Sequence, residues 1–485
     1  LGEEAYRFAD LLMVGGQRYW QVLPLNPVSP AFGYSPYASP SAFAGNPLLI
    51  NLDDLKRSKW FDLKIESQEE YDADFVDYDT IMHIKTELLL IAADCFFKNA
   101  SEEEAKRFKT FCSREASWLD DYALFAACAD HFGTNCWQAW EPAIAFRKKD
   151  ALTKCNTAFC QRINFHKFTQ YLFFTQWTLL KTYCNARSIR IIGDLPIYVP
   201  FDGADVWAHS DIFQLDPETR TLISVAGVPP DYFSSTGQLW GNPLYRWKNE
   251  EKKLHEGTYE WWVRRIRHLL KLVDVIRLDH FRGFEAYWAV PAGEATAIKG
   301  KWHKGPGREL FRRLRYDLGD IPFIAEDLGY ITPPVTKLRR QLGLPGMKVL
   351  QFAFDRNNKN PYLPHTYTDR NCVVYTGTHD NNTTNGWFYG PEIDNETRRY
   401  VMEYIGTECF SDFHWHLIRL AYRSIADLVI LPAQDVLGYG AEFRMNTPGT
   451  TSGNWKWKLK RGALTEELML RLRHMAQLYD RIPSA

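Results

Sequence analysis

The sequence has almost no net charge and no long apolar segment. It contains 58 Lys and Arg against 59 Asp and Glu, a formal net charge of −1. Proteins that bind nucleic acids or anionic membranes need a basic face, so this balance argues against both kinds of partner. No stretch approaches the roughly 18 uncharged apolar residues of a membrane span. The composition favours a neutral substrate, either small or polymeric.

Motifs for metals, cross-links and nucleotide cofactors are also missing. The nine cysteines are scattered, odd in number and without a CxxC pair. No histidine cluster supplies zinc-ligand spacing, and no GxGxxG or P-loop motif is present. We therefore expect no metal, no cofactor, and reduced cysteines of a cytosolic compartment. A bacterial cytoplasm and a plastid stroma both fit that expectation.

Aromatic residues are abundant instead, at 15% of the chain with 17 Trp. Aromatic rings are flat apolar platforms that suit a ligand with an apolar face and a polar rim. For any single Trp, a place in a Trp-rich helical core is an equally good interpretation.

Short apolar runs that end in polar residues recur along the chain, with helical patterns between most of them. Apolar strands that alternate with helices are typical of a parallel sheet covered on both faces. The runs span 18–27, 189–199, 273–281, 322–329, 348–354, 372–380 and 426–436. Eight such strands would close a barrel, and we predict an α/β fold of this kind, a (β/α)₈ TIM barrel with helical insertions. The runner-up is an open doubly wound sheet, but its glycine fingerprint follows none of these runs.

The first strand of the barrel is missing from this count. The helical pattern at 1–14 has no strand before it, and the chain does not open with Met. We expect the first strand in a segment that precedes the sequence. Residues 1–485 then form a single catalytic barrel with two excursions. Residues 53–165 are a helical insertion between the second and third strands, and residues 201–250 are an active-site loop of a length typical of functional loops.

Three carboxylates follow predicted strands with almost no spacer, namely Asp279, Glu326 and Asp380. Polar residues at the carboxyl ends of barrel strands point into the active site. Like charges in a shared mouth force one carboxyl to keep its proton near neutral pH. An ionised nucleophile about 5–5.5 Å from a protonated acid cleaves a glycosidic bond with retention. We predict Asp279 as the nucleophile and Glu326 as the acid/base.

Arg277 lies two residues before Asp279 and therefore on the same face of the strand. A guanidinium there would hold Asp279 ionised. An isolated Arg–Asp pair is more often a structural ion pair, and the segment around His379 and Asp380 has the composition of a turn. A metal at His379 and Asp380 would lack a third ligand nearby. The arrival of acids at consecutive strand ends favours a catalytic set.

Four short segments resemble, in the same order, the four short regions of the α-amylase superfamily of (β/α)₈ barrels. They are GDLPIYV (193–199), RLDHFRG (277–283), AEDLG (325–329) and THDNNT (378–383). Longer segments are similar to 4-α-glucanotransferases of the amylomaltase or disproportionating-enzyme type. These segments are GQRYWQVLPLNP (16–27), YSPYASPSAFAGNP (34–47), AGVPPDYFSSTGQLWGNPLY (226–245) and LGLPGMKVLQFAFD (342–355). The resemblance covers residues 1 to about 460.

The resemblance implies a retaining enzyme that moves an α-1,4-glucan segment to the 4-hydroxyl of an acceptor glucose or maltooligosaccharide. It implies that Asp279 is the nucleophile, Glu326 the acid/base, and Asp380 the carboxylate that grips the reacting sugar. Tyr37 would pack on the donor glucose, and Trp240 would be the acceptor-side platform. The other sugar-binding residues that it implies are Ser35, Asp194, Asp231, Tyr232, Phe233, Gln238, Arg277, His280 and His379.

Two alternatives stay open at this point. The first is an α-amylase-like hydrolase, from which the sequence differs in its YSPYAS and PPDYFS segments. The second is a non-catalytic glucan-binding protein on the same barrel. Such a protein would usually have lost one of the three acids, and all three positions are filled here.

Overall fold

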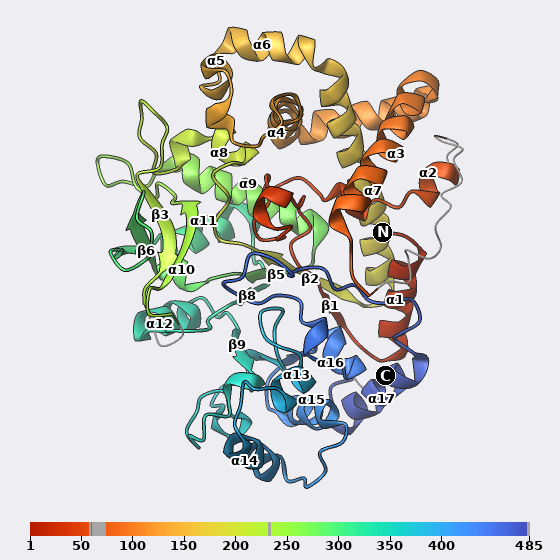
Figure 1. Ribbon diagram of the computed structural model, residues 1–485, viewed down its shortest axis with the longest axis vertical. Coiled ribbons are helices and arrows are strands. Elements are labelled where there is room, and N and C mark those ends of the chain that lie inside the picture. Colours follow the sequence, from red (N-terminus) through yellow and green to blue (C-terminus); the bar gives the residue numbers. More distant parts are fainter. Residues whose placement is uncertain (58–59, 61–73, 231–233, 483–485) are drawn as a thin grey trace.

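Seven parallel strands form one sheet that curves into a nearly closed barrel (Figure 1). The computed structural model describes residues 1–57, 60, 74–230 and 234–482. In their hydrogen-bonded order the strands are β1 (Tyr19–Gln21), β2 (Arg190–Leu195), β5 (Val275–Leu278), β8 (Phe323–Ala325), β9 (Gly346–Val349), β10 (Cys372–Tyr375) and β11 (Leu428–Ile430). All neighbouring pairs are parallel. The predicted fold class is confirmed, and each of the seven predicted runs overlaps one of these strands. The run at 348–354 overlaps β9 only at 348–349, and Leu350–Phe352 form a 3₁₀ helix.

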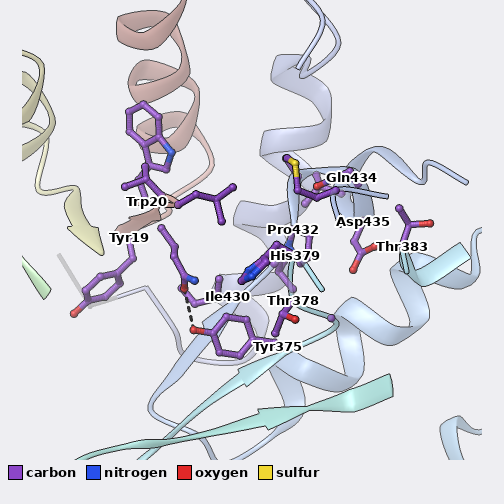
Figure 2. A pocket seen from close by; sticks show the side chains of 18 of the residues that line it. Tyr19, Trp20, Tyr375, Thr378, His379, Thr383, Ile430, Pro432, Gln434 and Asp435 are labelled. Atoms are coloured by element: carbon purple, nitrogen blue, oxygen red, sulfur yellow. Dashed lines mark hydrogen bonds between the residues drawn. The ribbon is translucent and has the colours of Figure 1, made fainter. Parts of the chain in front are cut away.

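β1 and β11 are the two ends of this sheet, and each has one strand neighbour in the described part of the chain. A cavity of about 290 Å³ lies beside them and is lined by Tyr19, Trp20 and Ile430 among others (Figure 2). Tyr375 and Gln21 also line this cavity, and the hydroxyl of Tyr375 donates to Oε1 of Gln21 at 2.9 Å (dashed line in Figure 2). One more strand between β1 and β11 would complete the barrel of eight that the sequence predicts.

A helix precedes most of the strands, as the alternating pattern predicts. The helices are α1 (Glu3–Val14) before β1, α7 (Cys160–Ala186) before β2, α9 (Glu256–Leu272) before β5, α11 (Arg308–Leu318) before β8, α12 (Pro333–Gln341) before β9, and α15 (Phe413–Arg423) before β11. Two further helices, α13 (Thr384–Tyr389) and α14 (Asn395–Ile405), follow β10, and α17 (Glu466–Leu478) lies near the end of the chain. All four residues of β5 are buried, which explains its unbroken apolar sequence.

The segment between β1 and β2 is helical and lies at one end of the barrel (Figure 1). It contains α2 (Asp53–Arg57), α3 (Tyr78–Asn99), α4 (Glu102–Phe132), α5 (Pro142–Ala145) and α6 (Lys149–Ala158). The longest of these, α4, starts with a reciprocal capping box between Ser101 and Glu104 and ends at Gly133, whose φ is 67°. The sequence therefore sets both ends of α4 locally.

A second, antiparallel sheet was not predicted from the sequence. Its strands are β4 (Gln238–Pro243), β3 (Ser224–Val228), β6 (Ala286–Pro291) and β7 (Lys301–Lys304), hydrogen-bonded in this order. It joins the excursion after β2 to the one after β5, so residues 201–250 are not only a loop. β4 and β7 are mostly exposed, so neither gives a clear apolar alternation.

A buried ion pair ties the helical insertion to the barrel. The side chain of Glu115 in α4 is 3% exposed and accepts hydrogen bonds at 2.9 Å from Nζ of Lys271 in α9 and at 3.0 Å from Nε1 of Trp118. Burial alone would raise the pKa of Glu115. The hydrogen bonds from Trp118, Lys271 and Arg114 outweigh burial and lower this pKa to about 2.

We expect Glu115→Gln to destabilise the protein in a pH-dependent way. The folded pKa lies below the unfolded value, so the ionised carboxylate stabilises the fold above about pH 4.5 and this contribution is lost as the pH falls toward 2. Because Lys271 and Arg114 are 47% and 64% exposed, solvent screens their charges, and we expect a loss of about 1–2 kcal/mol of unfolding free energy at pH 7 and a smaller loss at pH 3. Urea unfolding at both pH values measures the difference, with Glu102→Gln on the exposed side of α4 as the control. Equal destabilisation at both pH values would contradict the argument.

Candidate active site

Asp279 and Glu326 follow two strands that are direct neighbours in the barrel. Leu278 of β5 and Ala325 of β8 are register partners, and Asp279 and Glu326 are the next residues on each strand. The backbone N–H of Glu326 donates to the carbonyl of Leu278 at 3.0 Å. Neighbouring strands lie about 4.8 Å apart. The register therefore brings the two carboxyl-bearing residues side by side at the mouth of the barrel.

Arg277 donates hydrogen bonds to two carboxylates. Its Nη1 donates to both carboxylate oxygens of Asp194, each at 2.7 Å, and to Oδ1 of Asp279 at 3.1 Å. Asp194 and Arg277 are register partners on β2 and β5, and both are buried. Burial alone would lower the pKa of Arg277, but the carboxylates of Asp194 and Asp279 raise it well above its usual range. The guanidinium therefore stays charged.

The two carboxyls share an environment that favours the neutral form. Burial raises the pKa of Asp279 well above its usual range, and the positive charge of Arg277 only partly opposes this. Burial also raises the pKa of Glu326, against the charge of Arg277 and the backbone N–H groups of Leu328 and His280, which donate at 2.9 and 2.7 Å. Interacting carboxyls titrate as a pair. The pair therefore retains a proton at a higher pH than separate carboxyls would.

Tyr37 and His379 close one side of this centre. The hydroxyl of Tyr37 donates to Oδ2 of Asp194 at 2.7 Å. Its ring stacks on that of His379, with centroids 5.0 Å apart, and burial raises the pKa of Tyr37 well above its usual range. Burial lowers the pKa of His379, so its imidazole is neutral at pH 7. The hydroxyl of Ser35 accepts from the N–H of Tyr37 at 3.3 Å and steadies the turn below it.

Asp380 lies at the rim, with 48% of its side chain exposed. Oδ1 of Asp380 accepts from Nδ2 of Asn446 at 2.6 Å, and its carbonyl accepts from Nη2 of Arg444 at 2.6 Å. The ring of Trp455 packs against those of Tyr37 and His379, at 5.6 and 5.8 Å. Sequence reasoning missed Asn446 and Trp455. They lie in a non-periodic segment more than 60 residues beyond Asp380, and no local pattern marks them.

His280 and Trp240 lie next to Glu326, to which the backbone N–H of His280 donates. Their rings meet edge to face at 4.8 Å, and Trp240 on β4 is 37% exposed. Burial lowers the pKa of His280 to about 4, so its imidazole is neutral at pH 7. Oε1 of Gln238 accepts from Nε1 of Trp240 at 3.2 Å. The predicted loop residues Asp231, Tyr232 and Phe233 lie outside the described residues.

Two features are absent from the part of the chain that the structure describes. No group of three or more His, Cys, Asp or Glu side chains there is arranged to hold a metal ion. Within the same residues, no helix has the length and apolar character needed to cross a bilayer.

The fold and this site define the class of the protein: an enzyme built on a parallel α/β barrel, with a carboxylate centre at the carboxyl ends of the strands. The family model described as 4-alpha-glucanotransferase matches residues 1–465, and the chain belongs to that family. It is accordingly an enzyme with 4-alpha-glucanotransferase activity. The resemblance noted in the sequence is confirmed.

Individual relatives agree with this assignment over nearly the whole chain. The chain is 47% identical to a 4-alpha-glucanotransferase of Thermus thermophilus, over 99% of its length and 95% of that protein. It is 45% identical to one from Synechocystis, over 99% and 94%. Among solved structures, the amylomaltase from Streptococcus agalactiae in complex with acarbose superposes with a TM-score of 0.92 at 38% identity, covering 99% of this chain and 95% of that one.

Proposed function

We propose that the protein is a retaining 4-α-glucanotransferase that works through a covalent glycosyl-enzyme intermediate on Asp279. Its substrates are α-1,4-glucans and maltooligosaccharides, and glucose is an acceptor. The observation that carries the proposal is the register of β5 and β8, which sets Asp279 beside Glu326 while Arg277 holds Asp279. Double displacement at an anomeric carbon needs two carboxyls about 5–5.5 Å apart, and residues at the same level of adjacent strands, which lie about 4.8 Å apart, support such a spacing.

Two half-reactions follow from these roles. First, Glu326 protonates the glycosidic oxygen, the bond from C1 to that oxygen breaks, and Asp279 bonds to C1. Glu326 then takes the proton of an acceptor 4-hydroxyl, whose oxygen displaces Asp279 from C1. In the transition state of each displacement, Asp380 stabilises the positive charge on the sugar ring, and Arg277 stabilises the negative charge on Asp279. Two displacements restore the α configuration.

Transfer must outcompete water, which is present at about 55 M, and an ordered acceptor reaches effective molarities of roughly 10⁵ M or more. Incubation with maltotriose alone tests the proposal. Glucose together with a ladder of longer maltooligosaccharides supports transfer. Products that only become shorter would mean hydrolysis and would overturn it.

We expect Trp240→Ala to raise the share of hydrolysis. Trp240 is exposed beside His280, whose backbone N–H binds Glu326, so its ring is placed to hold an acceptor sugar. Losing a stacked ring costs about 1 kcal/mol of acceptor binding, which corresponds to a KM for glucose about fivefold higher. Glucose and reducing ends released from maltotriose, counted separately, give the ratio of transfer to hydrolysis. Tyr316→Ala removes an exposed ring on α11, away from the proposed acceptor residues, and serves as the control. An unchanged ratio for Trp240→Ala would contradict this role.

A cytoplasmic location, in a bacterium or in the stroma of a plastid, is part of the same proposal. None of the nine cysteines, all of which lie within the described residues, forms a disulfide, as is usual in reducing compartments. A relative from Arabidopsis thaliana, 42% identical over 99% of this chain, is named as chloroplastic/amyloplastic.

A further inference from the structure

An exposed aromatic pair flanks the loop that carries Glu326. Tyr330 lies four residues beyond Glu326 and is 73% exposed, and Trp302 on β7 is 38% exposed. The hydroxyl of Tyr330 makes no hydrogen bond within the described residues, so its ring is not held there by its polar end. Rings of this kind offer flat apolar surfaces on which a sugar can stack.

Arg282 fixes both rings in place. Its guanidinium carbon is 3.9 Å from the ring centroid of Trp302 and 5.5 Å from that of Tyr330. Nη1 of Arg282 also donates a hydrogen bond to the backbone carbonyl of Tyr330. Arg282 is itself buried, so its guanidinium is a fixed support. A ligand that stacks on a preorganised surface loses less free energy to ordering than one that must arrange it.

The pair is close to the acid/base and on its acceptor side. Four steps between Cα atoms place Tyr330 at most about 15 Å from Glu326. Oε1 of Glu326 accepts from the N–H of Leu328, two residues before Tyr330. Its Oε2 accepts from the N–H of His280, two residues before Arg282. Glu326 is the group that protonates the leaving sugar and deprotonates the acceptor, so sugars near it belong to the leaving and accepting chain.

We propose that Tyr330 and Trp302 form a distal acceptor subsite, which stacks on a glucose unit of a maltooligosaccharide acceptor beyond the unit held beside Trp240. The proposal rests on the proposed glucanotransferase function and names a determinant of acceptor chain length. An acceptor of several glucose units reaches the pair, whereas free glucose does not. The subsite therefore favours long acceptors over glucose without contributing to the chemical step.

The test separates donor from acceptor. The donor is α-maltosyl fluoride with its non-reducing 4-hydroxyl methylated, so it cannot accept, and its leaving fluoride occupies no sugar subsite. The C1–F bond breaks, the acceptor oxygen bonds to C1, and the acceptor proton passes through Glu326 to solvent. Transfer to glucose and to maltopentaose is measured by chromatography for the wild type, Tyr330→Ala, Tyr330→Phe and Tyr316→Ala. Tyr316 on α11 is 87% exposed and serves as the matched control.

For Tyr330→Ala we expect the KM for maltopentaose to rise about fivefold to tenfold, with the KM for glucose and both kcat values within about twofold of wild type. Tyr330→Phe and Tyr316→Ala should behave as wild type. The hydrogen bond from Arg282 is made to the backbone of residue 330, so the loop keeps this contact in each variant. Equal changes for both acceptors, or no change for either, would overturn the subsite. Failure of the wild type to transfer to either acceptor would instead refute the proposed function.

Discussion

Asp279→Asn is expected to lower kcat on maltotriose by at least about 10⁴-fold, because the amide cannot form the covalent intermediate. The same change should leave the fold as stable as the wild type or more stable. Burial raises the folded pKa of Asp279 well above its unfolded value, so the ionised form costs stability at neutral pH. Stability from this group is present below the unfolded pKa and is lost as the pH rises through the folded pKa. Asparagine removes that loss.

Thermal unfolding at pH 5 and pH 8 measures the second part of this prediction. The Tm of Asp279→Asn relative to wild type should be higher at pH 8 than at pH 5. Asp320→Asn is the control, since the side chain of Asp320 is 82% exposed. A wild-type rate in Asp279→Asn would remove the residue from the mechanism.

A small anion can distinguish a lost nucleophile from a distorted site. Asp279→Ala leaves space next to C1, on the face from which Asp279 attacks. With α-maltosyl fluoride and azide, the C1–F bond breaks and a C1–N bond forms by a single displacement. The expected product is a β-configured glycosyl azide. Its absence, together with loss of all turnover, would indicate that Asp279 holds the site together and does not attack.

The barrel could be predicted from the sequence because its strands are buried on both faces. β5 and β10 are buried along their whole length and read as continuous apolar runs. Asp279 follows β5 directly, and the strand end is easy to recognise because polarity changes abruptly there. The candidate catalytic carboxylates could be selected for the same reason, since each is the first acid after such a run.

The second sheet and part of the site could not be predicted, for a different reason. β4 and β7 are mostly exposed, so no continuous apolar run or apolar alternation marks them in the sequence. Asn446 and Trp455 reach Asp380 and Tyr37 only after the chain has passed through β11. The raised pKa of Asp279 depends in the same way on burial by distant segments. From the sequence alone, we predict that the positive charge of Arg277 keeps Asp279 ionised.

Glu326→Gln should affect the two half-reactions according to the leaving group. A sugar leaving group needs the proton of Glu326, and we expect the rate with maltotriose to fall about 10³-fold to 10⁴-fold. Fluoride leaves without a proton, so the first half-reaction with α-maltosyl fluoride should proceed within about tenfold of wild type. The acceptor hydroxyl then has no base, and the glycosyl-enzyme accumulates. Mass spectrometry of the intact protein should detect this added maltosyl group.

The pH dependence of turnover is an independent test of Glu326 as the proton donor. Glu326 must be protonated to donate, so kcat/KM for maltotriose should be lost as the pH rises through the pKa of Glu326, which burial raises above its usual range. Release of fluoride from α-maltosyl fluoride in the first turnover should lack this alkaline loss, because no proton is donated. Glu309→Gln, at an exposed position of α11, is the control and should keep both profiles. An identical alkaline loss with both donors would assign the ionisation to another group, because fluoride departs from C1 without a proton.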